Sequence, residues 1–170
     1  SFFILLLVFS RLIPHPPNFT PILASSIIAP FMLNNRFYGM FIPVLAMLIS
    51  DIIIGLHVYQ FVIYLTIASI SLVSPTNKNF KGFLFIAISG SLWFFITTNF
   101  AVWLSSELYS KDIEGLILCY TLAIPFFSNT IISTCLFTLL LAFFSKPLEL
   151  INEKTSSIIM HIINKSNRST

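Results

Sequence analysis

Long runs of apolar residues, separated by short polar or proline-containing stretches, make up the first 144 positions of the chain. Polar residues or prolines end several of the runs, as Pro14, Asn34 and Pro75 do, because proline lacks the N–H that would continue a helix. The pattern predicts an all-α polytopic membrane protein with six transmembrane helices. The expected helices cover residues 2–13, 19–33, 40–56, 58–74, 82–104 and 115–144.

The third and fourth runs meet at Gly55-Leu56-His57 with almost no loop, so they could also form one broken helix. The basic residues favour two helices. With six crossings, seven of the nine lysines and arginines lie on the side of the two termini. A fused helix would place Arg36 opposite Lys78 and Lys81. Since positive charge marks the cytoplasmic side, we expect both termini in the cytoplasm of a bacterial cell, with the bundle in the inner (plasma) membrane.

Residues 145–170 follow a different pattern from the transmembrane domain, which we assign to residues 1–144. Pro147 suits the first turn of a new helix. Isoleucines recur close to helical spacing, with charged residues between them. The pattern predicts an amphipathic helix on the cytoplasmic membrane surface. It would serve either as an interfacial tail or as a docking helix for a partner.

Composition narrows the function classes. Hydrophobic residues make up 56% of the chain and charged residues 9%, whereas soluble domains have about 25% charged residues. The net charge of +3 is spread along the chain and does not indicate nucleic-acid binding. Cys119 and Cys135 are expected to be packing residues. No sequence motif for ATP hydrolysis, zinc or redox chemistry is present.

The chain starts at Ser1 with a short apolar run, which fits a truncated first helix better than a signal peptide.

Several polar groups are expected at one membrane depth, in the outer half of the bundle. A charged group at the bilayer centre costs about 2.5–3.5 kcal/mol on insertion scales, so Arg11 and Asp51 should not face lipid. They could form a structural ion pair, line a polar pocket for a solute, or do both. The candidate substrate-binding residues are Arg11, His15, Asn18, Asp51, His57, Asn99, Trp103 and Asn129.

Each candidate also has a structural interpretation. A histidine at the rim, such as His15 or His57, is more often a hydrogen-bonded cap than a metal or haem ligand. Trp103 could anchor the helix at the membrane interface or stack on a planar ligand. Asn129 could bond between helices or bind solute, and Pro125 nearby frees backbone carbonyls. No serine has a histidine and an aspartate at a defined spacing, so an enzyme is not expected, and neither is a cofactor or metal.

Four motifs resemble a family of uncharacterised bacterial membrane proteins. They are residues 11–22 (RLIPHPPNFTPI), 50–57 (SDIIIGLH), 98–103 (TNFAVW) and 123–130 (AIPFFSNT). These proteins are described as transport proteins similar to the substrate-binding S component of energy-coupling factor (ECF) transporters. The resemblance covers roughly residues 10–144. It implies a six-helix bundle that binds a vitamin-like solute or a metal ion near the outer face, with a transmembrane coupling subunit and two ATPases as partners.

One part of the resemblance is missing. S components commonly contact the coupling subunit through an Ala-x-x-x-Ala pattern in the first helix, and residues 2–13 contain none. The nearest pair of small residues at that spacing is Ser25 and Ala29. We therefore expect a transport protein that captures a small organic solute from the outer side. The alternative is an accessory or assembly subunit of a larger membrane complex.

Overall fold

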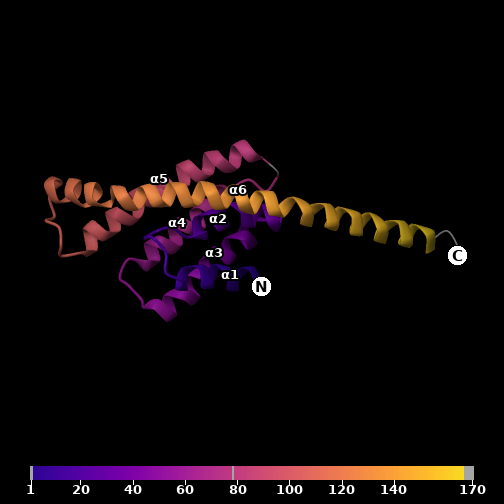
Figure 1. Ribbon diagram of the computed structural model, residues 1–170, viewed down its shortest axis with the longest axis horizontal. Coiled ribbons are helices and arrows are strands. Elements are labelled where there is room, and N and C mark those ends of the chain that lie inside the picture. Colours follow the sequence, from indigo (N-terminus) through magenta and orange to yellow (C-terminus); the bar gives the residue numbers. More distant parts are fainter. Residues whose placement is uncertain (1, 78, 167–170) are drawn as a thin grey trace.

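The computed structural model describes the backbone of residues 2–77 and 79–166, and side chains through residue 145 together with those of residues 159 and 161. These residues form six α-helices and no strand (Figure 1). The all-α prediction is therefore confirmed. The helices are α1 (Phe2–Leu12), α2 (Ile22–Met32), α3 (Arg36–Ile54), α4 (Gln60–Val73), α5 (Phe80–Ser105) and α6 (Ile113–Ser166).

Three of the six helices are long and apolar enough to cross a membrane. They are α3, α5 and the part of α6 from Ile113 to Ser145, with 19, 26 and 33 residues. Helices α1 and α2 have 11 residues each and α4 has 14. At ~1.5 Å per residue the short helices reach about 16–21 Å, well below a hydrocarbon core of about 30 Å. The structure thus supports three spans by length and composition, and not the six that the sequence predicts.

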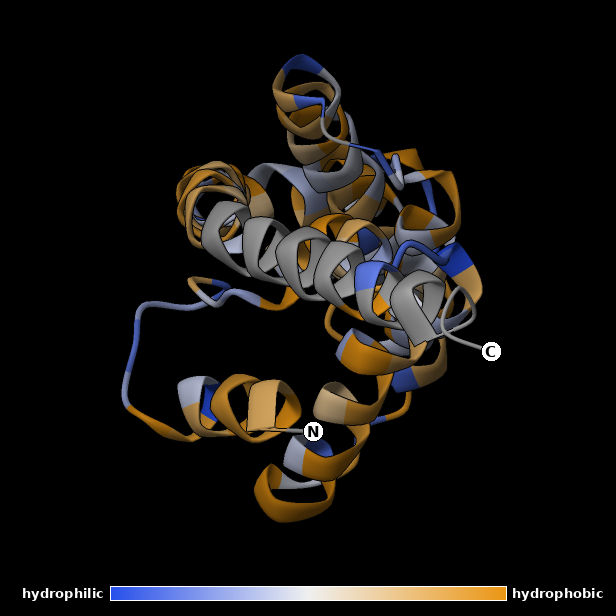
Figure 2. Ribbon diagram, turned by 90° about the vertical axis from the view of Figure 1, so that its right-hand side faces the viewer, coloured by the Kyte–Doolittle hydropathy of each residue, from blue (hydrophilic) through white to orange (hydrophobic). Residues whose placement is uncertain are grey.

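The outer surface of the bundle is apolar, as lipid contact requires. Figure 2 shows that apolar residues make up much of each helix, and several of them are largely exposed. Phe61 and Phe85 are each 70% exposed and Leu65 is 71% exposed. A soluble protein rarely leaves so much contiguous apolar surface to water. Together with the three long apolar helices, this surface indicates a membrane protein.

The apolar runs at 40–56 and 58–74 form two separate helices. Helix α3 ends at Gly55, whose φ of 125° is a conformation that other residues rarely adopt. Residues 55–59 then form a short link to α4. Figure 1 shows this link at the same end of the bundle as the link between α1 and α2. That end of the bundle carries most of the candidate residues.

Helix α2 forms the centre of the bundle. Ten of its 11 residues are buried, and it contacts α3, α4, α5 and α6. Its approach to α3 is so close that a Cβ atom at Gly39 would overlap the backbone of Pro30. Ser25 and Ala29 are both 0% exposed. This small-residue pair therefore packs helices inside the bundle and offers no surface to a coupling subunit.

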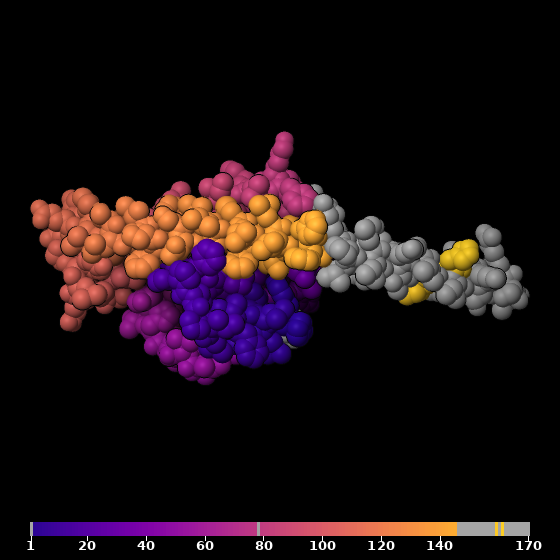
Figure 3. Space-filling view, viewed as in Figure 1, coloured from indigo at the N-terminus to yellow at the C-terminus, as the bar shows by residue number. Residues whose placement is uncertain are grey.

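Helix α6 runs without a break from Ile113 to Ser166 (Figure 1). The prediction of a separate helix that starts at residue 145 is therefore wrong, whereas the membrane-compatible part of α6 ends at Ser145, close to the expected end near residue 144. A proline removes one backbone hydrogen bond, but its fixed φ is itself helical, and this fold also carries Pro30 and Pro43 inside helices. The predicted amphipathic face of residues 145–170 depends on side chains outside the described residues. Figure 3 shows the part of α6 up to residue 145 lying along the bundle above the N-terminal residues.

Candidate functional site

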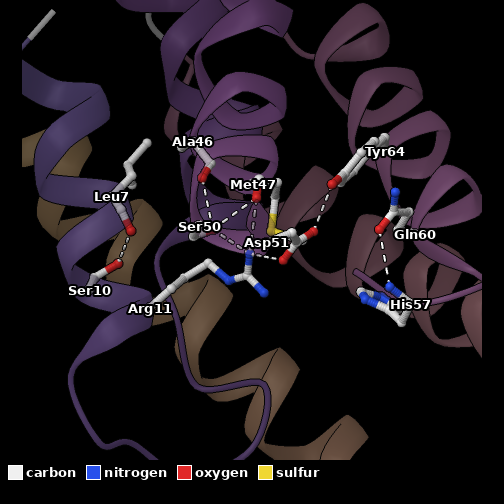
Figure 4. Close-up of polar contacts among 10 residues, drawn as sticks. All are labelled: Leu7, Ser10, Arg11, Ala46, Met47, Ser50, Asp51, His57, Gln60 and Tyr64. Atoms are coloured by element: carbon white, nitrogen blue, oxygen red, sulfur yellow. Dashed lines mark hydrogen bonds and ion pairs between the residues drawn. The ribbon is translucent and has the colours of Figure 1, made fainter. Parts of the chain in front are cut away.

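A buried polar network joins three helices near one end of the bundle (Figure 4). Arg11, in the last turn of α1, donates from Nη1 to Asp51 Oδ1 of α3 over 2.6 Å. Tyr64 of α4 donates its hydroxyl proton to Asp51 Oδ2 over 2.8 Å. Arg11 Nη1 also donates to Ser50 Oγ. Both oxygens of the Asp51 carboxylate therefore have a donor.

The two charges differ in exposure. The Asp51 side chain is 1% exposed, and that of Arg11 is 17% exposed. A buried charge without a partner costs several kcal/mol, so the two donors to Asp51 are what allow a carboxylate at this depth. The ion pair that the sequence predicts is present. Asp51 is enclosed by its partners, while part of the Arg11 guanidinium remains accessible.

The accessible side of Arg11 faces a cavity of about 280 Å³, which we call the Arg11 chamber. It brings together four of the predicted residues from α1, the α1–α2 link and the α3–α4 link: Arg11, His15, Asn18 and His57. The remaining lining residues are Thr20, Ile22, Leu23, Met47, Tyr59, Ile63, Ile67, Phe94 and Thr130. The His57 ring packs edge-on against Tyr59, with 4.5 Å between the ring centres.

A second cavity of about 360 Å³ lies beside the first, and we call it the Asn99 chamber. It is lined mainly by α5 and α6, and it includes the predicted residues Asn18 and Asn99. Its other lining residues are Pro17, Tyr59, Ile63, Phe94, Phe95, Thr98, Val102, Tyr109, Cys119, Leu122, Ala123, Phe126, Phe127 and Thr130.

The two chambers form one composite site because they share part of their walls. The shared residues are Asn18, Tyr59, Ile63, Phe94 and Thr130. Each chamber is near the lower limit of the roughly 300–1,000 Å³ typical of small-molecule sites.

The link between α1 and α2 is held against α6 by two long-range hydrogen bonds. Asn129 donates from Nδ2 to the Pro17 carbonyl oxygen over 3.0 Å, and Ser133 Oγ donates to the Asn18 carbonyl oxygen over 3.2 Å. Asn18 has a φ of 61°, a left-handed conformation that asparagine tolerates better than most residues. These contacts fix the Asn18 side chain on the lining of both chambers. Asn129 is thus a support for the site, and the lining of neither chamber includes it.

Trp103 also lies away from both chambers. Its indole N–H donates to the Ser110 carbonyl oxygen over 2.9 Å, and the Lys111 ammonium lies 5.8 Å from the ring centre. Lys111 also donates to the carbonyl oxygens of Trp103 and Ser106. Trp103 therefore orders the link between α5 and α6, and its position does not favour the predicted stacking on a solute.

The link between α5 and α6 contributes one residue to the site. Tyr109 lines the Asn99 chamber, and burial, followed by the neighbouring Cys119, raises the pKa of its phenol. The hydroxyl therefore stays protonated at neutral pH and can donate. Asp112 accepts hydrogen bonds from the Gly115 N–H over 2.8 Å and from Ser110 Oγ over 2.7 Å. These bonds, that of Gly115 above all, lower the pKa of the Asp112 carboxyl.

Sequence reasoning missed the aromatic wall and the third member of the network. Tyr64 lies 13 positions after Asp51, in a run with no unusual local pattern. Four phenylalanines line the Asn99 chamber: Phe94, Phe95, Phe126 and Phe127. The chain has 19 phenylalanines, and although Phe126 and Phe127 lie in the motif at residues 123–130, nothing in the sequence indicates that these four form one wall. Among the described residues, no three His, Cys, Asp or Glu side chains gather in a way that could hold a metal ion.

Residues 1–155 match the model of a family described as "Family of unknown function (DUF6580)". Comparisons with curated proteins and with solved structures gave no match. The match covers most of the chain, including all of the residues that line the two chambers.

Proposed function

We propose that this chain, which belongs to the family of unknown function DUF6580, is a membrane transport protein that captures a small organic solute in the composite site. By this proposal it works like the S component of an ECF transporter, as the resemblance of its motifs implies. A transmembrane coupling subunit and ATPases would then supply the energy, because the chain carries no ATP-binding motif of its own.

One observation carries the proposal. A membrane protein with few charged residues gathers Arg11, His15, Asn18 and His57 around a single cavity. That cavity adjoins a second one of about 360 Å³. Polar and ionisable groups are costly at membrane depth and are retained there mostly for function. A large concave site with a few convergent polar groups is the usual form of a small-molecule site.

The proposed topology has six crossings, with both termini in the cytoplasm of a bacterial cell and the composite site toward the outer face. Helices alternate in direction along the chain, and the short links at residues 13–21, 55–59 and 106–112 would lie outside. By this proposal the short helices α1, α2 and α4 cross the membrane together with their links. Helix α2 need not match the thickness of the lipid, because other helices enclose it. Positive charge near Arg36, Lys81 and the tail supports this orientation.

Native mass spectrometry of the full chain, purified gently from its own membrane, tests the proposal. Wild-type protein should retain a molecule of defined mass. Thr98→Phe places a ring in the Asn99 chamber and should abolish that retention. Thr121→Phe makes the same change on an exposed face of α6, outside both chambers, and should keep the molecule.

The second candidate function is an accessory subunit of a larger membrane complex. An apolar groove between α4 and α5 favours it, because a neighbouring helix could pack there. The groove is lined by Ser69, Ile70, Val73, Ile86, Ser89, Gly90 and Trp93. A wild-type protein that carries no small molecule but stays bound to other membrane subunits would contradict solute capture and support this role.

A further inference from the structure

The composite site differs in chemistry from one chamber to the other, and the difference defines a class of solute. We propose that the site takes an elongated organic monoanion, with its acidic group in the Arg11 chamber and a ring-bearing body in the Asn99 chamber. The body carries N–H or O–H donors. This inference rests on the proposed capture of a solute and specifies what kind of solute it is.

The acidic group is assigned from the charges on the lining. Arg11 is the single Lys, Arg, Asp or Glu residue among the described residues that line the two chambers. Asp51 is enclosed by Arg11 and Tyr64 and does not reach the lining. A cationic solute would therefore find no carboxylate to pair with. An anion would find a guanidinium.

Arg11 also has N–H groups that make no hydrogen bond within the described residues. A guanidinium has five N–H groups, and all the hydrogen bonds of Arg11 within the described residues come from Nη1. Figure 4 shows this nitrogen directed at Asp51 and Ser50. The N–H groups of Nη2 and Nε remain for a solute, and a guanidinium edge matches the two oxygens of a carboxylate. The bond to Asp51 holds the guanidinium in place, so binding costs little side-chain entropy.

The ring-bearing body is assigned from the walls of the Asn99 chamber. Four phenylalanines and two tyrosines line it, and no charged residue does. Phe95 packs against Phe127 with 4.6 Å between ring centres. Aromatic walls of this kind favour a flat apolar body, which gains from burial and from ring contacts.

The donors on the body are assigned from three residues of the same chamber, Asn99, Thr98 and Thr130, whose oxygens can accept hydrogen bonds, whereas the Tyr109 hydroxyl can donate one. Asn99 donates one of its two amide N–H groups to the Phe95 carbonyl oxygen over 2.8 Å, and its Oδ1, which accepts no hydrogen bond within the described residues, is available to the solute. Thr98 and Thr130 donate their hydroxyl protons to carbonyl oxygens of their own helices, over 2.7 and 2.8 Å. Their oxygens therefore also remain as acceptors. A solute body without donors would leave these buried acceptors unpaired, which lowers affinity.

Three probes of similar shape and different charge test the inference on the full chain in lipid nanodiscs, with binding followed by ligand-detected NMR. The probes are indole-3-propionate, its neutral amide indole-3-propionamide, and the cationic 3-(indol-3-yl)propan-1-amine. We expect the acid to bind about tenfold tighter than the amide, the ratio that one added charge-assisted hydrogen bond gives. The amine should bind more weakly than the amide, and methylation of the indole nitrogen should weaken the acid.

The double variant Arg11→Gln/Asp51→Asn removes both charges and leaves no unpaired ion. It should bind the acid and the amide with equal affinity. Thr98→Phe should weaken all three probes, and Thr121→Phe should change none.

The outcomes separate the two proposals. Equal binding of acid and amide by the wild-type protein would overturn the monoanion inference and leave solute capture standing. A preference for the acid that survives in the double variant would also overturn it. Both proposals fail if two results occur together: Thr98→Phe weakens the binding of none of the probes, and the native protein carries no small molecule.

Discussion

The side chain of Asn129 donates a hydrogen bond to the carbonyl oxygen of Pro17, which lies 112 positions earlier in the chain. The two residues come from the middle of α6 and from the proline-rich link between α1 and α2. Prolines lack N–H groups, so this link makes few backbone hydrogen bonds of its own. Its conformation is set by α6 through Asn129 and, one residue on, through Ser133 and Asn18.

Replacing Asn129 with alanine should release the link. The bond contributes about 0.5–1.5 kcal/mol, as single hydrogen bonds do. Amide exchange of Phe19, whose N–H bonds the Pro16 carbonyl oxygen, should accelerate, and solute retention should weaken. Hydrogen exchange measured by mass spectrometry checks this. Ser128→Ala is the control, because Ser128 bonds only the Ile124 carbonyl oxygen of its own helix. Unchanged exchange in Asn129→Ala would contradict the supporting role.

The two partners of the ion pair should respond unequally to mutation. Arg11→Gln leaves the Asp51 carboxylate, 1% exposed, without its counter-ion and should cost about 3–5 kcal/mol. Asp51→Asn should cost less, because Arg11 is 17% exposed and can reach water. The double variant should be more stable than Arg11→Gln alone. Thermal unfolding in a fixed detergent gives the order, and equal losses for both single variants would contradict it.

The close approach of α2 and α3 can be tested at two glycines. A methyl group at Gly39 would overlap the Pro30 backbone, so Gly39→Ala should destabilise the protein by about 1–3 kcal/mol, as overpacking does. Gly90→Ala is the matched control, because its Cβ would meet only the Ile70 side chain at 3.4 Å. That variant should be neutral or slightly more stable, since alanine favours a helix over glycine. Thermal unfolding of the two variants measures both effects.

The start of α6 should depend on pH through Asp112. The folded state lowers the pKa of this carboxyl, so the cap is present above the unfolded pKa and is lost as the pH falls through the folded value. Exchange of the Gly115 amide, corrected for its intrinsic pH dependence, should therefore accelerate below about pH 4. Asp112→Asn keeps a capping oxygen and should remove the pH dependence. A pH dependence that persists in Asp112→Asn would contradict this origin.

The apolar runs located the helices but not their lengths. The run at 19–33 contains α2, yet only residues 22–32 are helical. Its first residues continue the proline-rich link, since Pro21 precedes the helix. At the other end of the chain, α6 continues through Pro147, where the sequence indicated the first turn of a new helix. Apolar composition shows which segments must be surrounded by lipid or by other helices. The prolines do not show where a helix ends, because in this protein they occur both in a link and inside helices.

The sequence predicted those site residues that stand out because a charged or polar side chain costs free energy at membrane depth. Arg11 and Asp51 stand out because charge is rare in this chain, and they do form a pair. One cavity is lined by Arg11, His15, Asn18 and His57, because the end of α1 and the two links that carry the other three residues lie at the same end of the bundle. Trp103 was predicted at the site because it lies four positions after Asn99 on the same helix. That spacing could not show that the indole N–H donates a hydrogen bond to the Ser110 carbonyl oxygen in the link that follows. The aromatic wall depends on how α5 packs on α6, which no local pattern encodes.

The position of α2 has a consequence for how the protein is made. The helix has 11 residues and is enclosed by α3, α4, α5 and α6, three of which are synthesised well after it. A nascent chain that ends before residue 80 has neither α5 nor α6 to cover α2. Such a chain leaves the surface of α2 that packs on α5 and α6 uncovered, and its helix is too short to span the bilayer alone. In the proposed six-crossing topology, α2 therefore completes its packing only after the C-terminal half of the chain has been made, so its membrane insertion would depend on tertiary assembly.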